Sequence, residues 1–184
     1  MPILLESRLR PPQSLLALVR RERLLSRLSA AEAPLIVVSA PGGFGKTVTL
    51  SQWAASGTAP FAWLQAAADV NDPLLLLQYL TAALGGVIDV DPQVMAWLGL
   101  APPPVETRIL PALAAAVAGA APFVLVIDDA HLLTNEACWS IVGLLVEQLP
   151  SCAHVCLSGR GAPPLRLARS RTEGRLLELG PPEL

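Results

Sequence analysis

The sequence has few of the residues that bind metal ions or form disulfides. Its 184 residues include two histidines and three cysteines, Cys138, Cys152 and Cys156. No two cysteines have the C-x-x-C spacing of metal or redox sites, and an odd number cannot all pair. Cys138 falls on the apolar face of an expected helix and Cys156 within an expected strand, which favours a role as small core residues. The pattern therefore predicts neither a structural metal site nor a disulfide framework.

The sequence also lacks a long uninterrupted hydrophobic stretch, although 53% of its residues are hydrophobic and its mean hydropathy is +0.52. The best candidate, residues 109–127, is rich in alanine and is interrupted by Pro111, Gly119 and Pro122. Such a segment predicts a helix, a turn and a buried strand rather than a membrane span. Near the N-terminus, charged residues and prolines stand where a secretion signal needs apolar residues. We therefore expect a cytoplasmic protein with no membrane partner.

Lysine is nearly absent, and its single occurrence is informative. Lysine and arginine together number 13, and the only lysine is Lys46. It lies in the segment Ala40-Pro41-Gly42-Gly43-Phe44-Gly45-Lys46-Thr47. This segment follows the phosphate-binding loop pattern G-x-x-x-x-G-K-[ST], except that Ala40 replaces the first glycine. A compact ammonium on a flexible stem reaches the β and γ phosphates of a nucleotide as a point charge, which a planar guanidinium does poorly.

The residues around this loop have the arrangement that the pattern requires. A β-branched apolar run at 35–39 predicts a strand before the loop, and residues 48–54 can continue as a helix after it. Glycines let backbone N–H groups face phosphate oxygens, and a helix N-terminus favours anions. We expect Ala40 through Val48 to bind ATP, with Lys46 on the phosphates and the Thr47 hydroxyl on Mg²⁺. The alternative, a glycine-rich turn with an incidental lysine, does not account for these flanks.

Two adjacent aspartates, Asp128 and Asp129, follow the apolar run at 123–127. Carboxylates at the carboxyl end of a parallel strand face the crevice where α/β folds bind ligands. Asp128 is predicted to hold Mg²⁺ through its water shell, and Asp129 to orient or deprotonate the attacking water. Successive strand side chains point to opposite faces, so different roles are expected unless the chain turns between them. Taken alone, the two aspartates also fit an ordinary polar turn.

Arg160 follows the fourth expected strand at the same level of the sheet. The strand end directs it towards the crevice, which favours a catalytic role as a sensor of the γ-phosphate over an ordinary solvated arginine. His131 is compatible with a contact to Asp129 or to nucleotide-bound water, and equally with packing of the turn. The three residues predicted to take part in catalysis are thus Lys46, Asp129 and Arg160.

The order of elements predicts an α/β fold with a mainly parallel five-stranded sheet, and together with the phosphate-loop motif it predicts a P-loop NTPase three-layer α/β/α sandwich. Strands are expected at 35–39, 61–65, 123–127, 154–157 and 176–179, and helices at 15–28, 74–84, near 94–98, from about 109 to 119, and after a cap at Thr134 or Asn135. Asp72 is a predicted N-cap for the second of these helices. Residues 1–33 are expected to form a basic helical segment and residues 34–184 the NTPase core, within one domain.

Charge gives no overall signature of nucleic-acid binding, because the formal net charge is −2. Arginines gather in the first 27 residues and again after residue 159. A basic face for DNA is compatible with this distribution, and so are arginines around a bound triphosphate. No helix-turn-helix pattern accompanies them, so specific DNA binding by this segment alone is not expected.

The motifs together resemble the nucleotide-binding domain of large ATP-binding LuxR-type transcriptional regulators, the maltose-regulator-like members of the signal-transduction ATPases with numerous domains. The resemblance covers essentially the whole chain and rests on Ser39 to Thr47 with Ser51-Gln52-Trp53, Val19 to Leu25, Ala62-Trp63-Leu64, Asn71-Asp72-Pro73, Val126 to Leu133, Leu157 to Arg160, Pro163-Pro164-Leu165 and Arg175 to Leu179. Two departures are Gly159, which replaces a usual hydroxyl residue, and Ala67, which replaces a usual aspartate.

The resemblance implies a slow ATP-hydrolysing switch in which ATP promotes self-association of the full-length protein and ADP restores the resting state. It also implies that Arg20 lies in a basic helix beside the adenine. The winged-helix, helical-repeat and DNA-binding modules of the family are absent from these residues, which suggests a fragment of a regulator or a stand-alone remnant. The alternatives are a small-molecule kinase, which would need an acceptor pocket and an arginine-bearing lid, and a binding-only NTPase.

Overall fold

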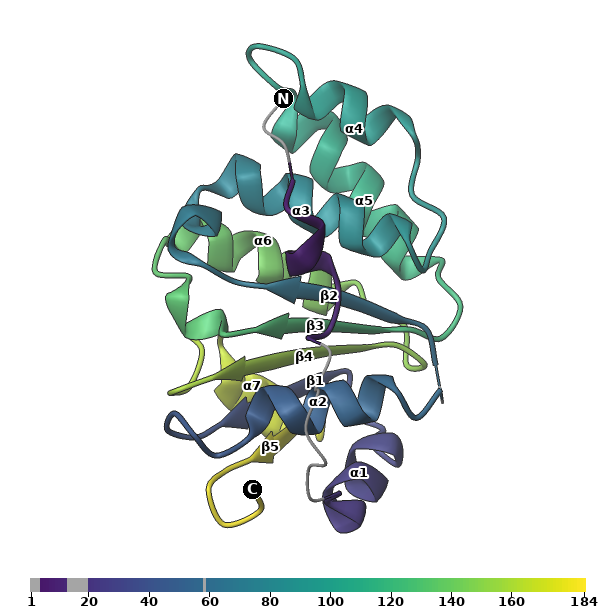
Figure 1. Cartoon of the computed structure of the whole chain (residues 1–184). Helices are drawn as coiled ribbons and strands as arrows, with labels where there is room; N and C mark the ends of the chain where they lie inside the picture. The colour runs from purple at the N-terminus through teal and green to yellow at the C-terminus, as the bar shows by residue number, and fades with distance from the viewer. Residues whose placement is uncertain (1–3, 13–19, 58) are drawn as a thin grey trace.

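The computed structural model describes residues 4–12, 20–57 and 59–184. At its centre is a sheet of five strands in the spatial order β2-β3-β4-β1-β5, and every neighbouring pair is parallel (Figure 1). The strands are β1 (Leu35–Ser39), β2 (Phe61–Gln65), β3 (Val124–Asp128), β4 (His154–Gly159) and β5 (Leu176–Leu179). The predicted α/β fold and five-stranded sheet are confirmed, and the sheet is parallel throughout.

Helices of very different length connect the strands. The α-helices are α1 (Glu22–Ser29), α2 (Lys46–Ala54), α3 (Pro73–Gly85), α4 (Gln93–Leu98), α5 (Leu110–Ala118), α6 (Glu136–Glu147) and α7 (Leu167–Thr172). Shorter helical turns are η1 (Glu6–Leu9), η2 (Ala68–Asn71), η3 (Val105–Ile109) and η4 (Ala130–Leu132).

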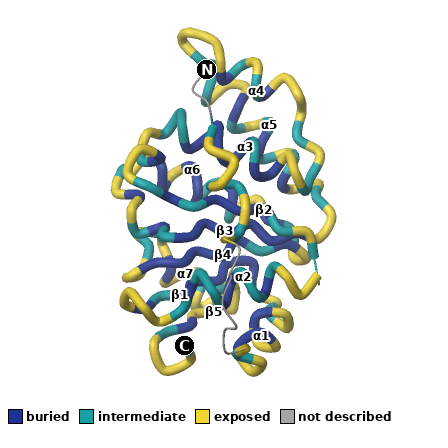
Figure 2. The backbone as a smooth tube through the Cα atoms, viewed as in Figure 1, coloured by how far each residue is buried: buried dark blue, intermediate teal, exposed yellow. Residues whose placement is uncertain are grey.

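Both faces of the sheet are covered, so the strands are the most deeply buried part of the chain (Figure 2). In β3, Leu125 and Ile127 pack into one apolar cluster, while Val124 and Val126 pack into another. The first cluster also contains side chains from α3, α4, α5 and α6, and the second contains side chains from α1 and α2. Because side chains alternate between faces along a strand, continuous apolar runs are what a sheet covered on both faces requires.

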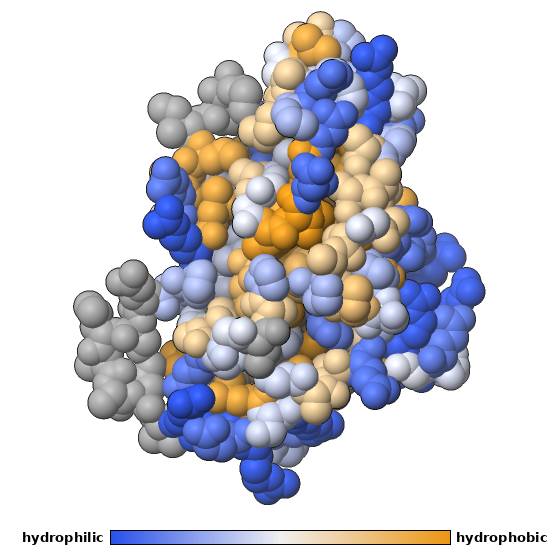
Figure 3. Space-filling view, turned by 90° about the vertical axis from the view of Figure 1, so that its right-hand side faces the viewer, coloured by the Kyte–Doolittle hydropathy of each residue, from blue (hydrophilic) through white to orange (hydrophobic). Residues whose placement is uncertain are grey.

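The strand order decides which loops meet at the carboxyl edge of the sheet. Strand β4 lies between β1 and β3, so its end separates the loop after β1 from the two aspartates at the end of β3. Pairing continues at this edge, where the Ala40 N–H donates to the Gly159 carbonyl at 3.1 Å and the Ala66 N–H donates to the Asp128 carbonyl at 2.8 Å. Figure 3 shows the side of the molecule that lies at the right of Figure 1. This side has apolar surface near its middle and hydrophilic residues towards its flanks.

The edge strand β2 is covered by the N-terminal segment. Turn η1 packs on β2 and on α3. The Arg8 guanidinium donates to both carboxylate oxygens of Asp69 at 2.8 Å, and the Leu5 N–H donates to the Tyr79 hydroxyl at 3.1 Å. These contacts protect an edge that would otherwise present unpaired backbone groups. The predicted division of the domain after residue 33 remains a prediction.

The predicted helix ends are mostly confirmed. Asp72 caps α3, since its carboxylate accepts from the Leu75 N–H at 2.8 Å. Of the two candidates for α6, Asn135 is the cap. The predicted helix at 15–28 corresponds to α1, which begins only at Glu22, and residues 15–19 lie outside the described part of the chain.

Strand β4 is two residues longer than predicted and extends to Gly159. Cys138 and Cys156 are buried as expected, and none of the three cysteines forms a disulfide in the described residues. No helix in the described ranges is long and apolar enough to span a membrane.

Candidate functional site

The loop between β1 and α2 has the backbone of an anion-binding turn. Gly43 and Gly45 have left-handed φ angles of 85° and 78°, a conformation that strongly favours glycine. Gly45 is also the N-cap of α2, so Lys46 and Thr47 are the first residues of that helix. Pro41 through Phe44 are exposed, which leaves the loop accessible to a ligand at the positive end of the helix.

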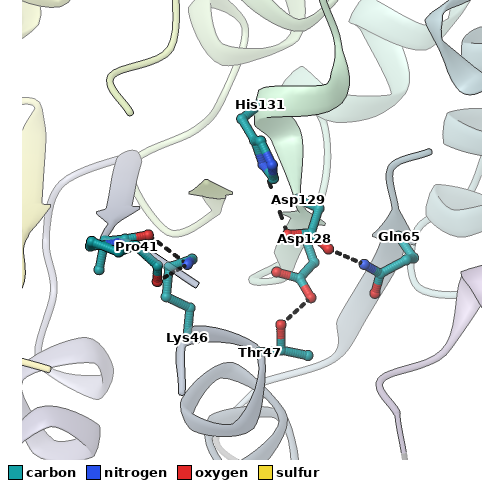
Figure 4. Close-up of polar contacts among 8 residues, drawn as sticks. Pro41, Lys46, Thr47, Gln65, Asp128, Asp129 and His131 are labelled. Atoms are coloured by element: carbon teal, nitrogen blue, oxygen red, sulfur yellow. Dashed lines mark hydrogen bonds and ion pairs between the residues drawn. The ribbon is translucent and has the colours of Figure 1, made fainter. Parts of the chain in front are cut away.

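Lys46 is buried within this exposed loop. Its ammonium donates to the carbonyl oxygens of Ala40 at 2.7 Å and Pro41 at 3.0 Å (Figure 4). Because an ammonium has three N–H donors, these two bonds fix its position and leave one proton for an anion. The loop thus places a compact positive charge at the end of β1, where the sequence predicted it.

Thr47 and Asp128 join α2 to the end of β3. The Thr47 hydroxyl donates to Oδ2 of Asp128 at 2.7 Å. Asp128 lies on the same face of β3 as Val124 and Val126, whose side chains pack with α2. Its carboxylate therefore points towards the start of that helix. The two residues predicted to hold a metal ion, 81 positions apart in sequence, are therefore in contact.

The Asp128 carboxylate is fully buried, and this desolvation raises its pKa despite the opposing hydrogen bond from Thr47. Its second oxygen, Oδ1, has no hydrogen-bond partner among the described residues. The hydroxyl of Ser158, a fully buried neighbour in β4, is near enough to lower the Asp128 pKa but forms no hydrogen bond with it.

Buried oxygens of this kind suit a hydrated Mg²⁺. Thr47 supplies a hydroxyl, Asp128 supplies a carboxylate oxygen without a partner, and Mg²⁺ favours one or two carboxylates with water and phosphate oxygens. A nearby cation also offsets the cost of burying the carboxylate. The residues present therefore fit the metal that the phosphate loop predicts.

Asp129 is directed differently from its neighbour because the chain turns there. Its φ angle is 53°, the only positive value at a non-glycine residue in the described chain. Oδ2 accepts a hydrogen bond from the Gln65 amide at 2.8 Å, and Oδ1 lies 3.8 Å from Nδ1 of His131. The side chain retains 37% exposure, unlike the fully buried Asp128. The two carboxylates thus occupy distinct surroundings, and the different roles predicted for them remain predictions.

Arg160 lies beyond the end of β4 and is exposed. Its guanidinium faces the phosphate loop, since a methyl group built on Gly42 would lie 4.0 Å from Nη2. Within the part of the chain that the structure describes, no carboxylate is paired with Arg160, so its charge is available to an anion in the loop. This position agrees with the predicted phosphate sensor, a role that remains a prediction.

From the N-terminal segment, Arg21 is the arginine that reaches the loop. The family resemblance places Arg20 beside the adenine, and that role remains a prediction. Arg20 forms an exposed ion pair with Glu22, with 3.0 Å between Nε and Oε1. The Arg21 Nη1 donates to the Phe44 carbonyl at 2.8 Å. A Cβ at Gly45 would lie 3.2 Å from the Arg21 guanidinium, which would have to shift slightly. The left-handed φ angle is the stronger reason for glycine at this position.

Two site residues were therefore missed, Arg21 and Gln65. Arg21 carries the same charge as the arginines around it, so the sequence held no sign of which one contacts the loop. Gln65 has a recognisable signal, since it is the last residue of a strand predicted to end at the same sheet edge as the aspartates.

Relatives are found over nearly the whole chain. It is 33% identical over 190 residues to the HTH-type transcriptional regulator MalT of Cronobacter sakazakii. The same regulator from Yersinia enterocolitica is 32% identical over 195 residues, and that of Serratia proteamaculans 31% over 194 residues. Each match covers 99% of this chain and 20% of the relative, so the chain spans about a fifth of the regulators' length. No protein-family model matches the chain.

A solved structure supports the fold. The Walker-type ATPase PABY2304 of Pyrococcus abyssi superposes with a TM-score of 0.56 at 15% identity, over 82% of this chain and 48% of that one. At this identity the likeness establishes the α/β fold of such ATPases and nothing finer. The resemblance to large LuxR-type regulators, predicted from the motifs, is confirmed by the MalT matches.

The contrast between Arg21 and Arg20 is testable. Arg21→Ala is expected to weaken ATP binding roughly tenfold, because a charge-assisted hydrogen bond to the loop is lost. Arg20→Ala is the matched control and should bind ATP like the parent, since it loses only an exposed ion pair. Isothermal titration of both variants with Mg²⁺–ATP measures the difference. A loss confined to Arg20→Ala would instead support Arg20 as the nucleotide contact.

Proposed function

Because this chain is related to MalT-type regulators over nearly its whole length, we propose that it binds Mg²⁺–ATP and hydrolyses it slowly, as a regulatory nucleotide switch. The observation that carries the proposal is the contact of Thr47 with Asp128 beside the anchored Lys46. A cation, a hydroxyl and a buried carboxylate converge at the N-terminus of α2, and few ligands other than a metal–polyphosphate complex use all three.

In this proposal the loop residues bind the phosphates. Lys46 keeps its bonds to two loop carbonyls and directs its remaining proton to the β and γ phosphates. Thr47 and Asp128 would hold Mg²⁺, whose positive charge would offset the negative charge of the phosphates. Arg21 stabilises the loop through the Phe44 carbonyl.

Hydrolysis requires a water molecule aligned with the γ-phosphorus. Asp129 would hold this water by accepting its proton, because the half-exposed carboxylate stands next to the metal site without belonging to it. The water oxygen bonds to phosphorus as the bond to the ADP oxygen breaks, and the proton passes to Asp129 and then to phosphate or solvent. Arg160 would stabilise the charge on the transferred group.

The regulatory effect of nucleotide binding would appear in the full-length protein. The chain spans about a fifth of the MalT proteins, so we propose that ATP binding here favours self-association of the full-length protein and that hydrolysis reverses it. With a net charge of −2, this segment by itself is proposed not to recognise a DNA sequence. A nucleotide-binding domain that has lost turnover is the second candidate, and measured hydrolysis separates the two.

Lys46→Ala is expected to abolish tight ATP binding, because it removes the compact cation fixed in the loop. Lys46→Arg should also bind poorly, since a planar guanidinium cannot reproduce the bonds to Ala40 and Pro41. Arg175→Ala, which removes an exposed cation elsewhere, is the control. Titration with a fluorescent ATP analogue measures affinity, and undiminished binding by Lys46→Ala would exclude this loop as the site.

Asp128→Asn and Asp129→Asn are expected to have separable effects. Asp128→Asn should weaken binding only in the presence of Mg²⁺, because the affected oxygens hold the metal. Asp129→Asn should bind ATP nearly normally and hydrolyse it about a hundredfold more slowly, as expected when a general base is lost. Affinity with and without Mg²⁺ and single-turnover hydrolysis distinguish them. Hydrolysis by Asp129→Asn at the parent rate would leave the pair with a metal-binding role alone.

A further inference from the structure

We infer that Gln65 is a positioning residue for Asp129, holding one carboxylate oxygen so that the other faces the attacking water. This inference rests on the proposed function and assigns a role to a residue that no motif includes. Gln65 is the last residue of β2 and is paired in register with Asp128 of β3. Its side chain therefore starts next to the residue that precedes Asp129. Its amide Nε2 donates to Oδ2 of Asp129 at 2.8 Å (Figure 4).

The need for such a residue follows from the backbone at Asp129. The carboxylate leaves a left-handed turn rather than a strand, so sheet geometry does not fix its direction. A hydrogen bond from a neighbouring strand supplies the missing constraint. With Oδ2 held by Gln65, the Oδ1 atom is the one left to accept from water, and the His131 ring lies 3.8 Å from it. One carboxylate thus has a fixed oxygen and an available oxygen.

The two segments that carry this contact are joined to each other. The Ala66 N–H donates to the Asp128 carbonyl, which ties the residue after Gln65 to the residue before Asp129. Further along, Oδ1 of Asn71 accepts from the backbone N–H groups of Thr134 and Asn135 at 2.8 Å each. The loops after β2 and β3 are therefore fixed relative to each other, and the amide of Gln65 is held within hydrogen-bonding distance of Asp129.

Gln65 acts through Asp129 rather than on the nucleotide, and this yields a specific kinetic signature. Gln65→Leu removes the donor and keeps a similar volume. We expect its single-turnover hydrolysis to fall roughly tenfold, part of the factor that a general base supplies, while its affinity for Mg²⁺–ATP stays at the parent value. Gln65→Leu combined with Asp129→Asn should be no slower than Asp129→Asn alone, because residues in contact are not additive.

The contact itself is testable without nucleotide. Gln65→Glu places a second carboxylate against Asp129, so its thermal midpoint should fall below that of the parent. In the double variant with Asp129→Asn, the new asparagine amide can donate to the new glutamate carboxylate, so the direction of the hydrogen bond is reversed. Asparagine also tolerates the left-handed turn, and the double variant should therefore recover most of the lost thermal stability. Gln93→Glu, at an exposed glutamine in the first turn of α4, is the matched control and should not lower the midpoint, because a negative charge is favourable at a helix N-terminus.

Each outcome decides the inference. A tenfold slower Gln65→Leu with unchanged affinity, non-additive with Asp129→Asn, supports it, as does recovery of stability in the exchanged pair. Parent-rate hydrolysis by Gln65→Leu overturns it and leaves the proposed function intact. A Gln65→Leu variant that loses ATP affinity and rate in equal measure shows a general structural role and also overturns it. A parent chain that binds ATP without hydrolysing it refutes the hydrolysis in the proposed function and this inference together.

Discussion

The hydrogen bond from Thr47 to Asp128 is the contact on which the rest of the site depends. It joins the first turn of α2 to the end of β3, across a sheet in which β4 separates β3 from β1. With this contact in place, the phosphate loop and the acidic strand end face the same space. Lys46, held by its own loop carbonyls, and Arg160, which faces Gly42, then lie at the border of that space.

The same contact carries an energetic cost. Asp128 is fully buried, its pKa is raised by desolvation, and one of its oxygens has no partner among the described residues. A hydrophobic residue at this position would cost less in folding. A buried carboxylate of this kind is suited to a site where a bound cation compensates for its charge, as in the proposed Mg²⁺ site. Asp129, in contrast, is partly exposed and accepts a hydrogen bond from Gln65.

The sequence predicted the sheet well because the physical signals were strong. Apolar runs covered on both faces marked β1, β3 and β4, and the glycines and single lysine marked the loop. The two-residue period of β3 predicted that the side chains of Asp128 and Asp129 would be directed differently. Other features depend on contacts between distant segments. No local pattern records how the loops meet, and this sets the left-handed turn at Asp129, the bond from Gln65 and the contact of Arg21 with the loop.

The most direct test of this account is thermal unfolding of the parent chain with ATP, with Mg²⁺, with both, and with ATP in a chelator. We predict that both ligands together, at about 100 times their dissociation constant, raise the free energy of unfolding by about 2.7 kcal/mol, and that ATP in chelator does much less. A midpoint that is unchanged by Mg²⁺ and ATP together would contradict the claim that Lys46, Thr47 and Asp128 form a metal–nucleotide site.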